Sequence, residues 1–199
     1  MHDMNRFASS PAYLNGLPQT GQTTVYVAGD NGTNQTGVPH RYEVLTTGQY
    51  SGTTAIVLNG KTDTHSNAVV IDHQYKLMYS QTLSASVGPT SNGLLPWTTN
   101  GSGEGVFTYA AAANTAGLAG YSDWRLPNYI EFLAQQIYQA PTALPNATAF
   151  PSFPSGVVVA TSTTQATNTA NPMSKISNSG TDAVQAKTVT IRVLLVRSM

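Results

Sequence analysis

The sequence predicts an α+β fold in which two helices flank a mixed, mostly antiparallel sheet, with long loops and an extended N-terminal arm. Short runs of β-branched and aromatic residues alternate with Gly, Asn and Pro, a pattern typical of strands and turns. Two longer stretches carry helix start and stop signals. The length of 199 residues suits one domain, which we place at 21–199, preceded by an arm at 1–20.

The composition limits the kinds of partner that the chain can have. Nine basic and nine acidic residues give zero net charge, and only 9% of the residues are charged, against about 25% in ordinary domains. Without a basic surface, we expect no binding to nucleic acid and no attraction to a membrane. The absence of cysteine excludes disulfides, thiolate metal sites and cysteine nucleophiles. No apolar run is long enough to predict insertion into a membrane.

The N-terminal quarter begins with a polar, Pro- and Gly-rich stretch, residues 1–21, which reads as an arm that a partner would order. "TTVYVAGD" predicts a short strand in which Val25 and Val27 alternate with Tyr26. "DNGTNQTG" predicts a turn. It resembles a calcium loop only superficially, because Asp30 is its sole charge and the distal bidentate Glu is missing. A calcium ion held mainly by carbonyl oxygens stays open as an alternative.

The next stretches, "RYEVLTTGQYSGTTAIVLNG" and "NAVVIDHQYKLMYSQ", predict two pairs of strands. Asn59 and Gly60 form a turn signal that favours positive φ. Residues 72–74 would form the bend of the second pair, and 89–105 would form a loop around Trp97. The predicted strands are Tyr42–Leu45, Thr53–Leu58, Ala68–Ile71 and Lys76–Tyr79.

Two helices are predicted in the middle of the chain. The first lies in "GVFTYAAAANTAGLAG", because four alanines have the best helix propensity and Gly117 can end the helix. The second begins at the N-cap Asn128, where Glu131 completes a capping box, and would end near Pro141. The apolar faces predicted for the helices are Phe107, Ala110 and Ala111 in the first, and Ile130, Phe132, Leu133 and Ile137 in the second.

The C-terminal third is mostly polar and proline-interrupted, with three strand signals. We predict a buried strand at Val157–Val159, a short one at Met173–Ile176 and the strongest strand of the chain at 187–198. Residues 141–154 would form a loop. In the last strand, Val189, Ile191, Val193 and Leu195 would share one face, with Arg192 and Leu194 on the other.

Four stretches in this order resemble the DUF1566, or Lcl C-terminal, domain family: "LPQTGQTTVYVAGDNG", "IDHQYKLMYSQ", "AGYSDWRLPNYIEFL" and "VLLVRS". The resemblance spans roughly 17–198 and looks like a phage virion-type member. It implies a C-type-lectin-like fold whose N- and C-terminal strands pair, with ligands bound by long loops, here about 141–187. The chain departs from the family where Tyr75 and Lys76 replace Thr-Gly, and where Tyr79 replaces Trp.

The motif Asp123-Trp124-Arg125 allows two interpretations. It could supply a catalytic acid, a stacking platform and an anion clamp. We favour the second interpretation, in which Trp124 fills the core and Arg125 forms an ion pair with Glu131 or Asp123. Losing one partner of such a pair is strongly destabilising when the pair is buried, so the motif would hold the fold together.

Other candidate residues are weaker. A metal ion needs three or four converging ligands, and the neighbours Asp72 and His73 would point to opposite faces of a strand. We therefore expect no metal, cofactor or catalytic residue, and assign no residue to ligand binding. Three aromatics could stack on sugars, although packing is favoured for each. The remaining metal candidates are Asp63, His65, His2 and His40, and the stacking candidates are Trp97, Tyr109 and Tyr121.

A neutral surface rich in hydroxyls and amides is common on proteins that work outside cells or in repeating assemblies, yet the N-terminus lacks a secretory signal. We therefore expect a non-enzymatic phage virion protein, made in the host cytoplasm, that serves in capsid decoration, a head fibre or a tail fibre. Its arm would bind other virion proteins, and its lectin-like domain would attach to a host surface or glycan. Repeating particles favour a homo-oligomer. The alternative is a bacterial cell-surface or periplasmic binding module or adhesin.

Overall fold

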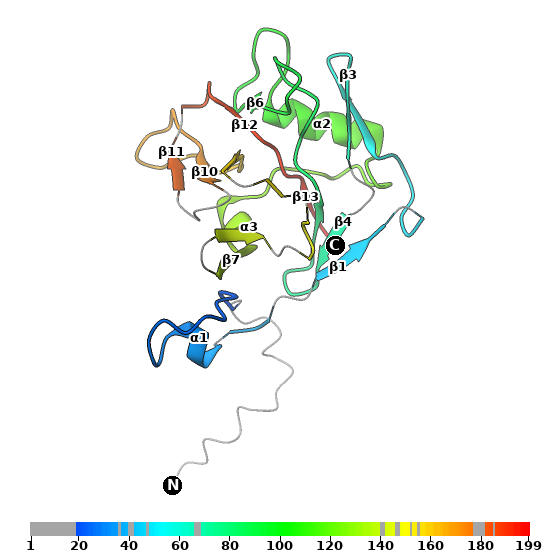
Figure 1. Ribbon diagram of the computed structural model, residues 1–199. Helices are drawn as coiled ribbons and strands as arrows, with labels where there is room; N and C mark the ends of the chain where they lie inside the picture. Colours follow the sequence, from blue (N-terminus) through cyan, green and yellow to red (C-terminus); the bar gives the residue numbers. More distant parts are fainter. Residues whose placement is uncertain are drawn as a thin grey trace.

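The computed structural model (Figure 1) describes residues 19–35, 37–39, 42–46, 48–65, 69–139, 142–145, 148–151, 153–154, 156–176, 182–184 and 186–199. The helices are α1 (Asn31–Asn34), α2 (Val106–Ala116) and α3 (Tyr129–Leu133). The strands of the first half are β1 (Tyr42–Leu45), β2 (Ala55–Leu58), β3 (Lys61–Thr64), β4 (Val69–Asp72), β5 (Leu77–Ser80) and β6 (Leu95–Pro96). Those of the second half are β7 (Gln136–Gln139), β8 (Thr142–Pro145), β9 (Val158–Val159), β10 (Met173–Ile176), β11 (Asp182–Val184), β12 (Thr190–Ile191) and β13 (Val196–Ser198).

The fold is α+β, with few helices and mostly antiparallel sheets, as the sequence predicts. The main sheet has the order β1-β4-β5-β13, and each neighbouring pair is antiparallel. Four smaller sheets surround it: β11-β10-β9, β12-β6, β2-β3 and β7-β8. The expected pairing of the N- and C-terminal strands is wrong, because β1 and β13 lie at opposite edges of the main sheet.

Both faces of the main sheet are covered, because every residue of β4 and β5 is buried. Side chains alternate along a strand, so Ile71 and Met78 join one hydrophobic cluster while Val70 and Tyr79 join another. The first cluster packs α2 against the sheet and contains Trp124. The second contains Phe132, Phe150 and Phe153. The sheet therefore separates two cores.

The last segment of the chain also lies between the two cores. The predicted alternation is confirmed here: Ile191, Val193 and Leu195 lie in the first cluster, and Leu194 lies in the second. The predicted continuous strand is wrong, because residues 192–195 separate β12 from β13. In that interval the Ser84 and Ser80 hydroxyls accept the amide hydrogens of Val193 and Leu195, in place of strand carbonyls.

Most other predicted elements are present. The strand at Tyr42–Leu45 is confirmed as β1, and that at Met173–Ile176 as β10. The Asn59–Gly60 turn is also confirmed, with φ of 50° and 73°. The first helix is confirmed as α2, although its buried face is not the predicted one: Phe107 is 43% exposed. The residues that α2 buries are Val106, Tyr109, Ala110 and Ala113.

The second predicted helix is much shorter than expected. The Asn128 cap and the capping box with Glu131 are confirmed, but α3 ends at Leu133. Ile130, predicted to face the core, is 66% exposed. The chain continues into the β7–β8 hairpin, which includes Ile137 and part of the predicted loop. Strand pairing and the β-propensity of Ile and Tyr prevail there over continuation of the helix. Within the region 141–187, β9 and β10 correspond to predicted strands, whereas β8 and β11 lie where loop was expected.

The N-terminal segment, defined here as residues 19–35, folds on itself rather than forming the predicted strand. The Asp30 carboxylate accepts hydrogen bonds from the backbone N–H groups of Tyr26 (2.9 Å) and Thr33 (3.0 Å). It caps α1, and the Gln35 amide donates to the Gln22 carbonyl across the segment. These bonds bend the chain at Val25–Val27, so they prevail over its strand propensity. In Figure 1 this segment projects from the rest of the described chain.

The longest of the described helices, α2, has 11 residues, and none of them is both long and apolar enough to cross a membrane.

After α2, the backbone at Gly120 packs closely against Gly52. A Cβ at Gly52 would lie 2.1 Å from the Gly120 nitrogen. Gly52 also has a φ of +95°, which disfavours any side chain. This contact therefore requires glycine.

We predict that Gly52→Ala destabilises the fold more than Gly48→Ala. Gly48 has nearly the same φ, +98°, but a Cβ there would meet nothing within 4 Å. Backbone strain should cost each variant about 1–3 kcal/mol, and the clash should add roughly 2 kcal/mol at Gly52. Urea denaturation of both variants measures the difference, and equal losses of stability would contradict the packing of Gly52 on Gly120.

Candidate functional site

Trp124, the centre of the recognised motif, lies in the first core with 2% of its surface exposed. Its indole Nε1 donates to the Leu118 carbonyl oxygen (2.8 Å). Its backbone N–H donates to the Asn114 side-chain oxygen (2.6 Å), while the Asn114 amide donates to the Trp124 carbonyl (2.9 Å). Because Asn114 belongs to α2, these bonds fix the motif to that helix.

Arg125 pairs with Glu131 and not with Asp123, the other expected partner. Two guanidinium nitrogens each lie 2.7 Å from a Glu131 carboxylate oxygen. Glu131 also accepts the N–H of Asn128 within the capping box. Burial alone would raise the pKa of the Glu131 carboxyl, but the bonds from Arg125 and Asn128 lower it overall. The backbone of Arg125 exchanges hydrogen bonds with Val196 in β13. We call Trp124, Arg125 and Glu131 the brace.

Asp123 instead pairs with Arg197 at the surface. The guanidinium Nε lies 2.7 Å from the Asp123 Oδ1, and its plane covers the Tyr121 ring at 3.9 Å. This bond lowers the pKa of the Asp123 carboxyl. Asp123 therefore attaches β13 to the motif, and Tyr121 serves as the support on which Arg197 stacks.

The model of the Lcl C-terminal domain family matches residues 68–197, about two thirds of the chain. The chain belongs to this family. No curated protein and no solved structure matches it. The matched region contains both strands of the sheet centre, the brace and most of the final segment, so the Lcl domain includes most of both cores, while Ile56 and Leu58 of the first core precede it.

The metal candidates of the Lcl domain do not converge. His73 lies at the surface, 2.8 Å from Glu43 Oε2. Asp72 is buried, and its Oδ1 accepts the N–H groups of Gln74 and Tyr75. Within the described part of the chain, no three His, Asp or Glu side chains form a metal cluster. His2 and His40 lie outside the described residues.

Asp63, His65 and Tyr109, considered separately in the sequence, form one buried network. The Tyr109 hydroxyl donates to Asp63 Oδ2 at 2.7 Å, and His65 Nε2 lies 2.5 Å from that hydroxyl. Since the hydroxyl donates to Asp63, it accepts from Nε2–H. The other imidazole nitrogen meets the Thr82 hydroxyl at 2.9 Å. Burial lowers the pKa of His65 and so favours the neutral imidazole, although the Asp63 carboxylate opposes this effect.

The network holds the β2–β3 hairpin against α2. The Asp63 carboxylate accepts the N–H groups of Ala85 and Ser86 as well as the Tyr109 hydroxyl. All three network residues are at most 4% exposed, so no reactant reaches them from solvent. In "KTDTHS", Asp63 and His65 stand two residues apart, so their side chains share one face of a strand. This spacing is the sequence signal that could have indicated that both side chains point inward.

Trp97, the first stacking candidate, is half-buried and packs against the first core. Its Nε1 donates to the Thr161 carbonyl (2.9 Å), and the Phe107 ring meets it edge-on with a centroid separation of 4.8 Å. The Lys187 ammonium lies over the ring, 4.2 Å from its centroid. Tyr109 is buried in the network described above. The three aromatic candidates thus all make packing contacts.

Asp30, the calcium-loop candidate, has its oxygens occupied by donors. The Asp30 carboxylate accepts from the Tyr26 and Thr33 N–H groups and from the Thr33 hydroxyl. It also accepts from the Val27 N–H and the Gln22 side-chain amide. The bond from the Tyr26 N–H is the main cause that lowers the pKa of its carboxyl. Asp30 therefore acts as a cap and loop organiser.

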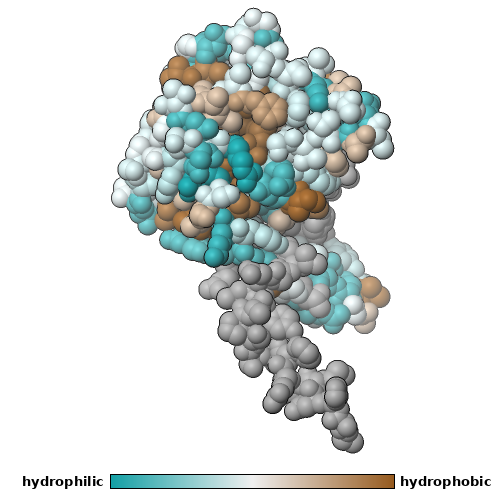
Figure 2. All heavy atoms as spheres, turned by 180° about the vertical axis from the view of Figure 1, so that it is seen from behind, coloured by the Kyte–Doolittle hydropathy of each residue, from teal (hydrophilic) through white to brown (hydrophobic). Residues whose placement is uncertain are grey.

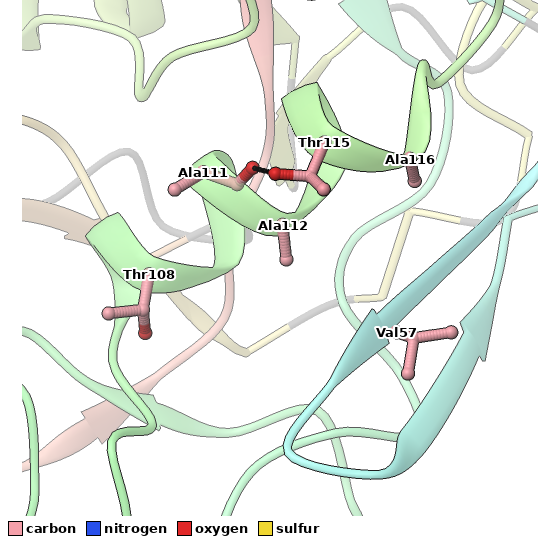
Figure 3. Close-up of a pocket in the computed structure, with 6 residues that line it drawn as sticks. All are labelled: Val57, Thr108, Ala111, Ala112, Thr115 and Ala116. Carbon is pink, nitrogen blue, oxygen red and sulfur yellow. Dashed lines mark hydrogen bonds between the residues drawn. The ribbon is translucent and has the colours of Figure 1, made fainter.

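A groove of about 480 Å³ lies between α2 and the β2–β3 hairpin (Figure 3). In Figure 3, Thr108, Ala112 and Ala116 extend from the helix toward the hairpin that carries Val57. Val57 is 57% exposed. Sequence reasoning missed this groove, although α2 has no charged residue, which is unusual for a surface helix. The six residues that line the groove are Val57, Thr108, Ala111, Ala112, Thr115 and Ala116.

We predict that Glu131→Gln destabilises the domain by about 1–3 kcal/mol, because it removes the charge from a bidentate pair that solvent screens only in part. The Glu131 side chain is 17% exposed, against 57% for Asp123 in the second pair. The matched variant Asp123→Asn should therefore lose less than about 1 kcal/mol. Chemical denaturation measures both, and a larger loss in Asp123→Asn would contradict the importance of the brace.

We also predict a pH dependence that His65 causes. Its pKa is lowered from 6.5 in the folded chain, so below about pH 6.5 the unfolded chain binds a proton that the folded chain does not. The free energy of unfolding should therefore fall as the pH drops from about 6.5 to 5, by at most about 1.4 kcal/mol per unit. Denaturation of the unchanged chain and of His65→Gln across this range tests the cause. An equal slope in both would contradict it.

Proposed function

We propose that the chain is a non-enzymatic phage virion protein that displays its Lcl domain, with a C-type-lectin-like fold, for attachment to a host surface or glycan. It would serve in capsid decoration, a head fibre or a tail fibre. Its synthesis would take place in the host cytoplasm. The first 20 residues would bind other virion proteins, and the domain would face outward as one copy of a homo-oligomer.

The observation that carries this proposal is that carboxylates of the described residues make structural contacts. Seven acidic side chains in the described part of the chain each contact a backbone N–H or a basic group. The carboxylates therefore stabilise turns, caps and ion pairs, which is the pattern of a scaffold rather than of a catalytic acid–base pair. These residues are Asp30, Glu43, Asp63, Asp72, Glu104, Asp123 and Glu131.

The position of the family motif adds support. The brace connects α2, α3 and β13, so the most recognisable residues of the Lcl domain maintain the scaffold. A rigid scaffold with polar loops is suited to binding, because loops can vary without loss of the fold. The loop at 161–172 is an example: it is rich in Thr and Asn and has no charged residue.

A bacterial cell-surface or periplasmic binding module, or an adhesin, is the second candidate. The same neutral surface favours it, because hydroxyl and amide groups can bind glycans outside cells as well as on a particle. The two candidates differ in where the chain is found. A virion protein is present in purified particles, whereas a surface module is present in the envelope fraction of uninfected cells.

We predict that mass spectrometry of purified particles from the source organism detects this chain at a level comparable to the known structural proteins of the particle. Uninfected cells, fractionated in parallel, provide the control. Peptides of the chain found only in the bacterial envelope would overturn the virion proposal and support the surface module.

A further inference from the structure

An amine, a carboxylate and a carboxamide meet between the turn of the β2–β3 hairpin and the loop before α2. The Lys61 ammonium nitrogen lies 2.9 Å from Glu104 Oε1, and the Asn100 amide nitrogen donates to Glu104 Oε2 at 3.3 Å. The Glu104 side chain is only 2% exposed. Figure 2 shows residues of intermediate hydropathy over much of the domain surface, where charged groups are few. One buried carboxylate thus connects an amine with an amide.

The oxygen of the same amide is held by two backbone N–H groups. Asn100 Oδ1 accepts from the N–H of Ser102 at 3.0 Å and from the N–H of Glu104 at 2.8 Å. The loop is also closed on itself, because the Asn100 N–H donates to the Glu104 carbonyl and the Gly103 N–H donates to the Asn100 carbonyl. When a nucleophile attacks an amide carbon, negative charge develops on the amide oxygen, and paired N–H groups stabilise that charge.

The other end of the reaction is equally well positioned. Lys61 also donates to the Gly88 carbonyl, which holds its amine beside Glu104. The Glu104 carboxylate contacts both the amine and the nitrogen of the amide, so it can move a proton from one to the other. A nucleophile, a proton carrier, an amide and two donors to its oxygen are the groups that acyl transfer to an amine requires.

We propose that Lys61 and Asn100 join in an intramolecular amide crosslink, with Glu104 as the group that transfers protons. Glu104 takes a proton from the Lys61 ammonium, and the freed amine attacks Asn100 Cγ, so that an Nζ–Cγ bond forms and an electron pair moves to Oδ1. Glu104 then protonates Nδ2, the Cγ–Nδ2 bond breaks and the carbonyl re-forms. The second proton on Nζ passes through Glu104 to the departing ammonia, which leaves as ammonium. No oxidant or reductant takes part.

The crosslink forms slowly, because the resting pair is ionic. The bond from Lys61 is the main cause that lowers the pKa of the Glu104 carboxyl, although burial opposes it. A free amine is therefore present in only a small fraction of the molecules at any moment. The contact compensates for this scarcity, since it keeps the amine and the amide together in every folded copy.

The crosslink would join the β2–β3 hairpin covalently to the loop that leads into α2. Such a link stabilises a fold by restricting the unfolded chain. The chain has no cysteine and cannot form a disulfide, whereas an amide forms without oxidation and resists reducing agents. The inference concerns the chemistry of the folded domain, so it holds for a virion protein and for a surface module alike.

The test is tryptic peptide mapping by mass spectrometry of the full chain, when fresh and after days of incubation. Trypsin does not cleave after an acylated lysine, so residues 42–76 should appear joined to residues 77–125, lighter than their sum by one ammonia molecule. A succinimide at Asn100-Gly101 also loses ammonia, but it leaves the cleavage after Lys61 intact and joins no peptides. Fragmentation of the joined peptide locates the link.

Three variants test the assigned roles, and thermal melting verifies that each is folded. Lys61→Arg keeps the positive charge and should abolish the joined peptide. Glu104→Gln keeps the amine and the amide but cannot carry the proton, so linking should slow at least about a hundredfold. Asp123→Asn is the control, because it removes a carboxylate that pairs with Arg197 instead, and it should link like the unchanged chain.

We expect the joined peptide to accumulate with time in the unchanged chain and in Asp123→Asn, and the linked chain to melt at a higher temperature than Lys61→Arg. The proposal would be overturned by an unchanged chain that remains unlinked after incubation, or by Glu104→Gln linking at the unchanged rate. A link to Asn59, which also contacts Glu104, would overturn the assignment of Asn100. These outcomes do not depend on where the chain is found, so they are separate from the particle experiment.

Discussion

The bidentate pair of Arg125 and Glu131 is the interaction on which the architecture depends. Glu131 completes the cap of α3 while it binds Arg125, and the backbone of Arg125 pairs with Val196 in the main sheet. The neighbouring Trp124 is bonded to α2 through Asn114. One short stretch thus fixes both longer helical elements to the same edge strand. A domain without disulfides needs such a connection, because short strands and a helix of five residues have little stability of their own.

Elsewhere in the domain, too, the few charged side chains make structural contacts. With only 9% charged residues, seven carboxylates of the described residues have a local structural role. Asp63 combines with Tyr109 and His65 to join a hairpin to α2, and Glu104 binds Lys61 across the same region at 2.9 Å. The surface is left to hydroxyl, amide and small apolar groups. This division explains how a neutral surface and a firmly connected interior coexist in one chain, and why the groove is uncharged.

Sequence reasoning succeeded where local physics decides the structure. Asn128 and Glu131 lie three residues apart, and the capping box needs no other part of the chain. It failed where a distant or competing partner decides. The strand propensity of Val25–Val27 is overridden by bonds to Asp30, and the last strand is interrupted where Ser80 and Ser84 supply hydroxyl acceptors. Tyr109 and Asp63 are separated by 46 residues, so no short pattern indicates that they meet.

The position of residues 190–198 between the two cores affects how the chain can fold during synthesis. Ile191 and Val193 complete one core, and Leu194 completes the other. While the ribosome is still translating this region, neither core has its central element, and the earlier strands have no complete hydrophobic surface to pack on. Folding of the whole domain must therefore wait until its last strand has emerged, and nascent chains that stop before it would expose apolar surface to chaperones and proteases.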